Sequence, residues 1–264
     1  MLALAAACPR QPASKPAPPP APQPPTHILQ VWAEPSLIAP LADIAPVLKK
    51  HGLVLQITPK ESGELARDAA AGKLGSPPEV YLFTGERALP ALIKAKAVDE
   101  ATARTFAGDR LVVAGRQGER WPSPTVFDLY RLRFKFFGVA DSASALGEVC
   151  DEALKSDGAY KRIEQRIRRY PGQKELIAAL IANEVQLAMV YASAVAQDPE
   201  LGVSVVVGAD LHTDIRYRAV AAAGKASAEG VGGLLRLLAE DAGIQQSLGG
   251  LGLLTRSGAL EAVR

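Results

Sequence analysis

The sequence predicts an α/β fold with two lobes and a hinged cleft between them. Short apolar runs alternate with longer amphipathic runs along residues 26–264, as in parallel sheets covered by helices. A second group of strands follows the first, and the chain then continues into a purely helical segment. Because these last helices are expected to return to the first lobe, two crossing segments would join the lobes and act as a hinge.

The individual elements follow from local pattern. Runs typical of strands are, in order, 27–33, 53–57, 79–83, 110–115, 134–140, 186–191, 203–208 and 216–223. Runs typical of helices are 37–50, 63–71, 144–155, 159–168, 173–183 and 230–240. This order predicts a first lobe from residues 26–108 plus 219–264 and a second lobe from residues 109–218. In such folds, ligands bind at the carboxyl ends of the strands.

Residues 1–25 differ in composition from the rest of the chain. The apolar run MLALAAAC is too short to cross a bilayer, which needs about 20 residues. Nine prolines follow it without any acidic residue, which is typical of an extended polyproline tether. The segment resembles a bacterial lipoprotein signal whose cysteine, here Cys8, is lipidated, and the missing basic head fits a start further upstream. A disordered tail with an incidental cysteine is the alternative.

Charge and side-chain chemistry argue against several functions. The chain has 30 Lys and Arg against 28 Asp and Glu, and Arg10 and Lys15 lie in the tether. The charges of residues 26–264 are therefore balanced, so nucleic acid is not an expected partner. The three histidines show no metal-binding spacing, and the serines lack a nucleophile elbow. We therefore expect neither an enzyme nor a cofactor. Cys150 is expected to be a buried apolar residue.

Two serines stand where an apolar strand runs into a helix. Ser36 lies in WAEPSL and Ser62 in KESGEL. A helix start presents unpaired N–H groups and about half a positive charge, so two such starts with serine hydroxyls could hold an anion without a basic side chain. The simpler alternative is that each serine only caps its helix, a contribution of about 1 kcal/mol.

Five blocks together resemble the periplasmic molybdate-binding proteins, which deliver substrate to ATP-driven molybdate importers. The blocks are VWAEPSLIAPLADIA, KESGELARDAAAGKLGSPPEVYLF, GDRLVVAG, IANEVQLAMVYASAVA and IRYRAVAAAG. They occur in the family's order across most of residues 28–260. The resemblance implies a type II periplasmic binding-protein fold that closes over a tetrahedral oxyanion.

The resemblance also implies the ligand-binding residues. Ser36 and Ser62 fall on the two serines of the family, and Tyr191 falls on the tyrosine that donates from the second lobe. Leu146 and Gln173 fall near positions that donate a backbone N–H. The alternative for Tyr191 is a core tyrosine at the end of a strand.

Two glutamates depart from the family pattern. Glu34 stands where the family has a small residue, and Glu61 replaces a serine. An acidic side chain at a helix start competes with a bound anion for the same partial charge. A dianion would bind poorly if Glu34 or Glu61 points into the cleft, whereas molybdate remains plausible if both point outward.

The resemblance thus implies an extracytoplasmic protein that captures an oxyanion, molybdate or tungstate first, for a membrane permease and its ATPase. We expect a monomer in the periplasm or on the outer face of the cell membrane, lipid-anchored through Cys8. The alternative is a degenerate binding protein with another ligand, or with a sensing or scaffolding role.

Overall fold

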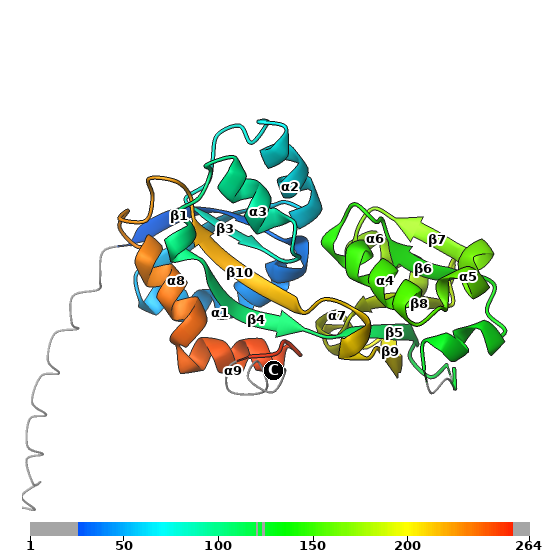
Figure 1. Cartoon of the computed structure of the whole chain (residues 1–264). Coiled ribbons are helices and arrows are strands. Elements are labelled where there is room, and N and C mark those ends of the chain that lie inside the picture. The colour runs from blue at the N-terminus through cyan, green and yellow to red at the C-terminus, as the bar shows by residue number, and fades with distance from the viewer. Residues whose placement is uncertain (1–25, 120, 123–124, 256–264) are drawn as a thin grey trace, which may run out of the picture.

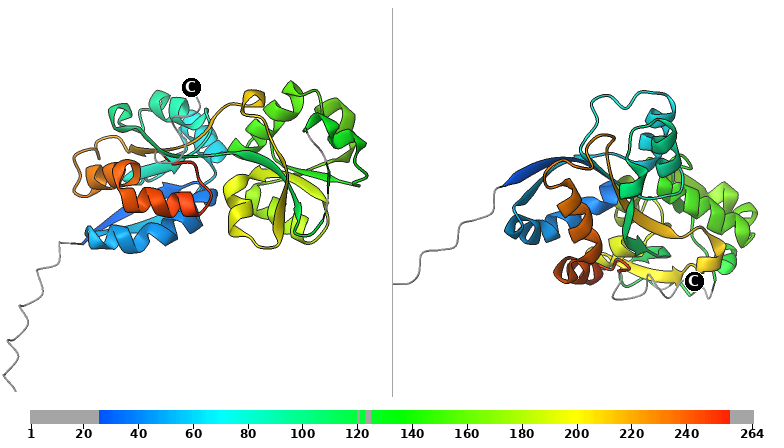
Figure 2. Two further views of the ribbon diagram at one scale, coloured as in Figure 1. Left: turned by 90° about the horizontal axis from the view of Figure 1, so that it is seen from below. Right: turned by 60° about the vertical axis from the view of Figure 1, so that its left-hand side comes forward.

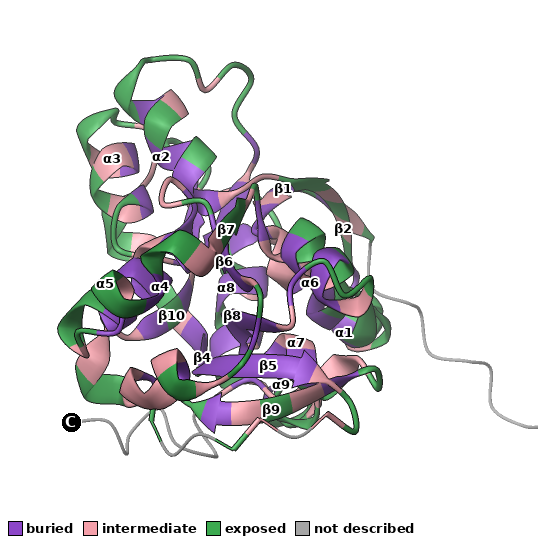
Figure 3. Ribbon diagram, turned by 90° about the vertical axis from the view of Figure 1, so that its right-hand side faces the viewer, coloured by how far each residue is buried: buried purple, intermediate pink, exposed green. Residues whose placement is uncertain are grey.

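The computed structural model describes residues 26–119, 121–122 and 125–255, which form two α/β lobes side by side (Figures 1 and 2). Each lobe is built on one five-stranded mixed sheet with helices packed on it. Figure 3 shows that the strands of the second sheet are mostly buried and that many exposed residues lie on the helices and loops around it. The two-lobed α/β fold predicted from the sequence is therefore confirmed. Cys8 lies outside the described residues.

The first sheet has the strand order β2-β1-β3-β10-β4. The strands are β1 (His27–Ala33), β2 (Leu53–Pro59), β3 (Val80–Phe83), β4 (Arg104–Asp109) and β10 (Ile215–Ala221). β1 is parallel to β2 and β3, whereas β10 is antiparallel to β3 and β4. Because β1, β2 and β3 each lead into a helix, the starts of these helices lie along the carboxyl edge of the sheet.

Helices cover both faces of the first sheet. On one face, residues of α1 (Ile38–Lys50), α8 (Val231–Glu240) and α9 (Ala242–Gly250) join a single apolar cluster with β1. On the other face, α2 (Ser62–Ala70) and α3 (Ala88–Lys94) pack on Tyr81 and Phe83. The C-terminal helices therefore return to the first lobe, as the order of elements predicts (Figure 1).

The second sheet has the order β7-β6-β8-β5-β9. The strands are β5 (Leu111–Arg116), β6 (Phe137–Ala140), β7 (Ile167–Tyr170), β8 (Leu187–Tyr191) and β9 (Leu201–Val206). One apolar cluster unites this sheet with α4 (Ala145–Ser156), α5 (Tyr160–Ile163), α6 (Gln173–Ile181) and α7 (Ala192–Gln197). β6 and β7 are parallel, so α4 and α6, which follow them, begin at one edge of this sheet.

Two chain segments cross between the sheets. The first runs from β4, which ends at Asp109, into β5, and the second from β9 into β10. The second lobe was expected to extend to residue 218, but β10 begins at Ile215 and pairs with β4 from there. Residues 215–218 thus belong to the sheet of the first lobe, because their partners Asp109 to Thr105 do.

Some elements differ from the local pattern. The helix expected over 159–168 ends by Arg166, and β7 begins at Ile167. In this segment Arg166 and Arg168 stack on phenylalanine rings, and Arg169 binds Asp151 at 2.7 Å. No helix within the described ranges is long and apolar enough to span a membrane.

Candidate functional site

Four helix starts face one another where the lobes meet. η1 (Pro35–Leu37) leads into α1, and α2 begins at Ser62, both in the first lobe; α4 and α6 begin in the second. The lobes touch here, since Arg67 of α2 donates to the Ala143 carbonyl at 3.1 Å, just before α4. Two grooves of this junction share Glu61: one contains Ser36 and Gln173, and the other contains Ala143 and Ser144.

Ser62 lies at the centre of the junction and is buried. Its hydroxyl accepts the Thr84 N–H at 3.0 Å and donates to Glu34 Oε2. Its backbone N–H donates to the same oxygen at 2.7 Å. The cap position of α2 is occupied by Glu61 and that of η1 by Glu34, and neither Ser62 nor Ser36 caps its helix. The alternative that the serines are simple helix caps is therefore wrong.

Glu34 points into the junction rather than away from it. Its side chain is only 5% exposed, and its carboxyl takes the hydrogen bonds at the α2 start that an anion would otherwise take. Burial, and then repulsion from Glu61, raises the pKa of Glu34 from 4.5 to about 8, although the hydrogen bonds from Ser62 oppose this. Because Glu34 points inward, a dianion is expected to bind poorly whenever Glu34 is ionised.

Glu61 lies between Glu34 and the second lobe. Its carboxyl is hydrogen-bonded to that of Glu34 and lies against Gly172, the cap residue of α6. Burial raises the pKa of Glu61, with Glu175 and Glu64 adding repulsion and the bond to Glu34 acting the other way. Lys60, the adjacent cation, bonds Asp68 at 2.7 Å and Glu64 at 3.4 Å.

Ser36 and Tyr191 meet a residue that sequence reasoning missed, Tyr217. The hydroxyls of Ser36 and Tyr217 are 3.1 Å apart, and the Tyr191 ring packs edge-on to the Tyr217 ring, with centroids separated by 6.3 Å. Tyr217 also lies near Asp109, which accepts hydrogen bonds from Ser193. Tyr217 comes from β10 and Asp109 from β4, so only the long-range strand pairing brings them to the site.

Leu146 and Gln173 lie in the first turns of α4 and α6. Ser144 caps α4 by accepting the Gly147 N–H at 3.0 Å, while the Leu146 side chain is buried in the core of the second lobe. Gln173 uses its side chain to accept the Tyr191 N–H at 3.1 Å, which ties α6 to the end of β8. Both residues are thus at helix starts, as expected, and their roles as ligand donors stay predictions.

The comparisons with known proteins match this architecture. A family model described as bacterial extracellular solute-binding protein matches residues 29–246. The chain belongs to this family of solute-binding proteins.

Two molybdate-binding proteins are similar to this chain, one in sequence and one in fold. The molybdate-binding protein ModA of Escherichia coli (strain K12) is 25% identical over 195 residues, which cover 72% of this chain and 75% of ModA. The periplasmic molybdate-binding protein of Azotobacter vinelandii is 14% identical, with a TM-score of 0.73 over 86% of this chain and 98% of that one.

The sulfate-binding protein SubI of Mycobacterium tuberculosis H37Rv has the same fold. It gives a TM-score of 0.68 at 14% identity, and the match covers 86% of each chain. The likeness to this and to the Azotobacter structure concerns the fold.

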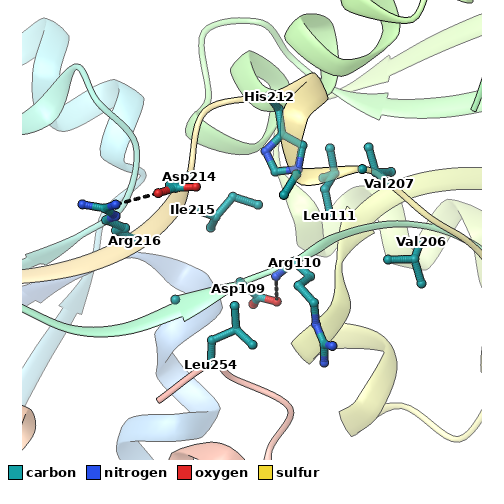
Figure 4. A pocket seen from close by; sticks show the side chains of 13 residues that line it. Asp109, Arg110, Leu111, Val206, Val207, His212, Asp214, Ile215, Arg216 and Leu254 are labelled. Atoms are coloured by element: carbon teal, nitrogen blue, oxygen red, sulfur yellow. Dashed lines mark hydrogen bonds and ion pairs between the residues drawn. The ribbon is translucent and has the colours of Figure 1, made fainter. Parts of the chain in front are cut away.

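A separate hollow lies at the hinge of this solute-binding protein (Figure 4). Its volume is about 390 Å³, and both crossing segments line it, with Leu111, Val207 and Ile215 among its apolar residues. The five predicted ligand residues are not among the described residues that line it. Of the described part of the chain, no group of three or more His, Cys, Asp or Glu could hold a metal ion.

Proposed function

We propose that this solute-binding protein captures a tetrahedral oxyanion between its lobes and delivers it to the permease and ATPase of an importer. The observation that carries the proposal is the start of α2, where the Ser62 N–H and hydroxyl already hold a carboxyl oxygen, that of Glu34. Helix starts with hydroxyl donors stabilise an anion through partial charges and hydrogen bonds, without a cationic side chain.

Molybdate or tungstate is the first candidate ligand. ModA and the Azotobacter protein are named as molybdate-binding, whereas SubI is named as sulfate-binding. All three names concern tetrahedral dianions, and a fixed set of neutral donors would select among these by the spacing of their oxygens. We propose Ser36, Ser62 and Tyr191 as side-chain donors, with backbone N–H groups at Leu146 and Gln173.

The same proposal covers location and assembly. We propose that the chain acts as a monomer in the periplasm or on the outer face of the cell membrane, anchored by a lipid on Cys8, and that it catalyses no reaction. The match to an extracellular solute-binding family supports a place outside the cytoplasm.

A second candidate is a degenerate binding protein with a sensing or scaffolding role. The observation that favours it is Glu34, whose carboxyl takes the Ser62 donors for itself. The two candidates differ in ligand affinity, because a degenerate protein would not bind any oxyanion.

Replacing the two serines tests the proposed site. Ser62→Ala and Ser36→Ala are each expected to weaken oxyanion binding by about 1 to 3 kcal/mol, since each removes a charge-assisted hydrogen bond from a dry cleft. Equilibrium dialysis with molybdate measures the effect. Ser156→Ala is the matched control, because Ser156 is exposed at the far end of α4. Affinities equal to that of the control would place the ligand elsewhere.

A further inference from the structure

The α2 start already contains an acidic group of the protein itself. Glu34 follows β1 directly, is 5% exposed, and accepts both the N–H and the hydroxyl of Ser62. An oxyanion that uses these donors must therefore either displace the Glu34 carboxyl or share the site with it. If Glu34 were ionised, two negative groups would meet in a region of low dielectric constant, which is strongly unfavourable.

The titratable side chains around Glu34 that the structure describes are an acid and two tyrosines, so a proton rather than a cation neutralises its carboxylate. The Glu34 and Glu61 carboxyls lie close enough to repel each other, and burial together with this repulsion raises the pKa of Glu34 to about 8, so Glu34 carries a proton at neutral pH. Tyr191 and Tyr217 approach Glu34 from β8 and β10, and both have a pKa raised well above the ordinary value by burial. Within the described ranges, the ion pairs do not join any Lys or Arg to Glu34.

The charged groups that face Glu61 do not supply a net positive charge to the pair of carboxyls. Glu64 and Arg67 reach it from α2, and Glu175 from α6. Arg67 gives one guanidinium N–H to the Ala143 carbonyl. Glu64 and Glu175 outweigh Arg67 around Glu61, so they do not offset a second negative charge on Glu34, and the pair retains one proton below the pKa of Glu34.

We propose that Glu34 is a specificity-determining residue of the oxyanion site: an oxyanion is bound only together with one proton, which lies between the Glu34 carboxyl and a ligand oxygen. This inference rests on the proposed function. On binding, the Glu34 O–H turns from Glu61 to the ligand, no covalent bond breaks, and Glu61 stays ionised beside the Gly172 end of α6.

A proton requirement distinguishes two classes of oxyanion. Molybdate and sulfate are fully ionised in neutral and alkaline solution, so they rely on the proton of Glu34. Hydrogen phosphate brings its own proton and can donate it to an ionised Glu34. Affinity for molybdate should therefore fall about tenfold for each pH unit above the pKa of Glu34, while affinity for hydrogen phosphate should not show this fall.

Calorimetric titration of the full chain with molybdate, sulfate and phosphate from about pH 6 to about pH 10 tests the proposal. Glu34→Gln is the informative variant, because its amide retains an acceptor for Ser62 and an N–H donor but cannot ionise. Glu100→Gln, an exposed acid of the same lobe, is the matched control. Titration in two buffers of different ionisation enthalpy counts the protons taken up by the unmodified chain, so the test also works without a variant.

The outcomes separate the two proposals. Molybdate affinity that falls with pH in the unmodified chain and in Glu100→Gln, uptake of one proton in alkaline buffer, and a flat profile in Glu34→Gln would support the proton requirement. A flat molybdate profile without proton uptake in the unmodified chain would overturn it and leave the oxyanion function standing. If neither the unmodified chain nor Glu34→Gln binds any of the three anions at any pH, both the proton requirement and the oxyanion function are wrong.

Discussion

At the scale of single residues, the buried carboxyl of Glu34 dominates the site. Glu34 takes the place from which an anion would reach Ser62, and burial keeps its carboxyl protonated to a higher pH than in water. The sequence predicts that Glu34 or Glu61 can compete with an anion in this way. It does not predict the direction of the side chain, because that depends on Ser62 and Glu61 coming close in space.

This burial predicts a pH dependence of folding. The pKa of Glu34 is raised from 4.5 to about 8 in the folded chain, so the folded state keeps its proton over a range where the unfolded state loses it. The associated stability is fully present below pH 4.5 and is lost as the pH rises through about 8, by on the order of 5 kcal/mol. Glu34→Gln should match the unmodified chain in acid and exceed its free energy of unfolding in alkali.

Urea unfolding at a series of pH values measures this difference, with Glu100→Gln again as the control. If the stability curves of Glu34→Gln and the unmodified chain run parallel across the range, the carboxyl of Glu34 is not the buried acid described here.

Other residues of the site mark the limit of sequence reasoning. Ser36 and Ser62 were expected at helix starts because each follows an apolar strand, and the structure places them there. Tyr217 and Asp109 have no local signal of this kind. Tyr217 reaches Ser36 because β10 pairs with β3, which pairs with β1, and Asp109 reaches Ser193 because β5 pairs with β8. No pattern within one element encodes these pairings.

At the scale of elements, the α2 start and the turn before α4 fit together through a glycine. A Cβ atom at Gly63 would overlap the Ala143 carbonyl oxygen, and the carbonyl belongs to the other lobe. Only a residue without a side chain allows the two helix starts to approach this closely. Contact between the lobes at this point therefore depends on Gly63.

Gly63→Ala should hold the lobes apart. We expect oxyanion affinity to fall at least about tenfold, since donors from the second lobe no longer reach the ligand, while folding stability changes by less than about 1 kcal/mol. Binding titration together with small-angle X-ray scattering of the loaded protein measures both effects. Gly233→Ala is the control, because a Cβ there meets no atom within 4 Å. Equal affinities for the two variants would show that closure does not require this contact.

The local sequence pattern predicted most helices and strands, but it failed where tertiary contacts determine the secondary structure. The sequence predicts a helix that continues to residue 168, whereas Ile167 and Arg168 belong to the strand β7. In the fold, Ile167–Tyr170 pairs with β6, and Arg168 stacks on Phe136 at 3.8 Å from the ring centroid. The short helix α7 gave too few residues for a periodic signal.

At the scale of the whole molecule, the alternation of strands and helices predicted two lobes, and the return of the C-terminal helices predicted two crossings. Asp109 lies at the first crossing, where it accepts hydrogen bonds from Ser193 at the α7 start and lies near Tyr217 of β10. Burial raises its pKa to about 6. Because the Tyr217 hydroxyl is 3.1 Å from that of Ser36, these contacts place the first crossing next to the candidate site.

The proposed function requires that the junction between the lobes captures an oxyanion. The decisive measurement is calorimetric titration of the chain and of Glu34→Gln with molybdate, tungstate, sulfate and phosphate at neutral pH. We predict saturable one-to-one binding of at least one of these anions, strongest for molybdate or tungstate, and its loss in the double variant Ser36→Ala with Ser62→Ala. If neither protein binds any of these anions, or if the double variant binds them as well as the unmodified chain, the junction is not an oxyanion site.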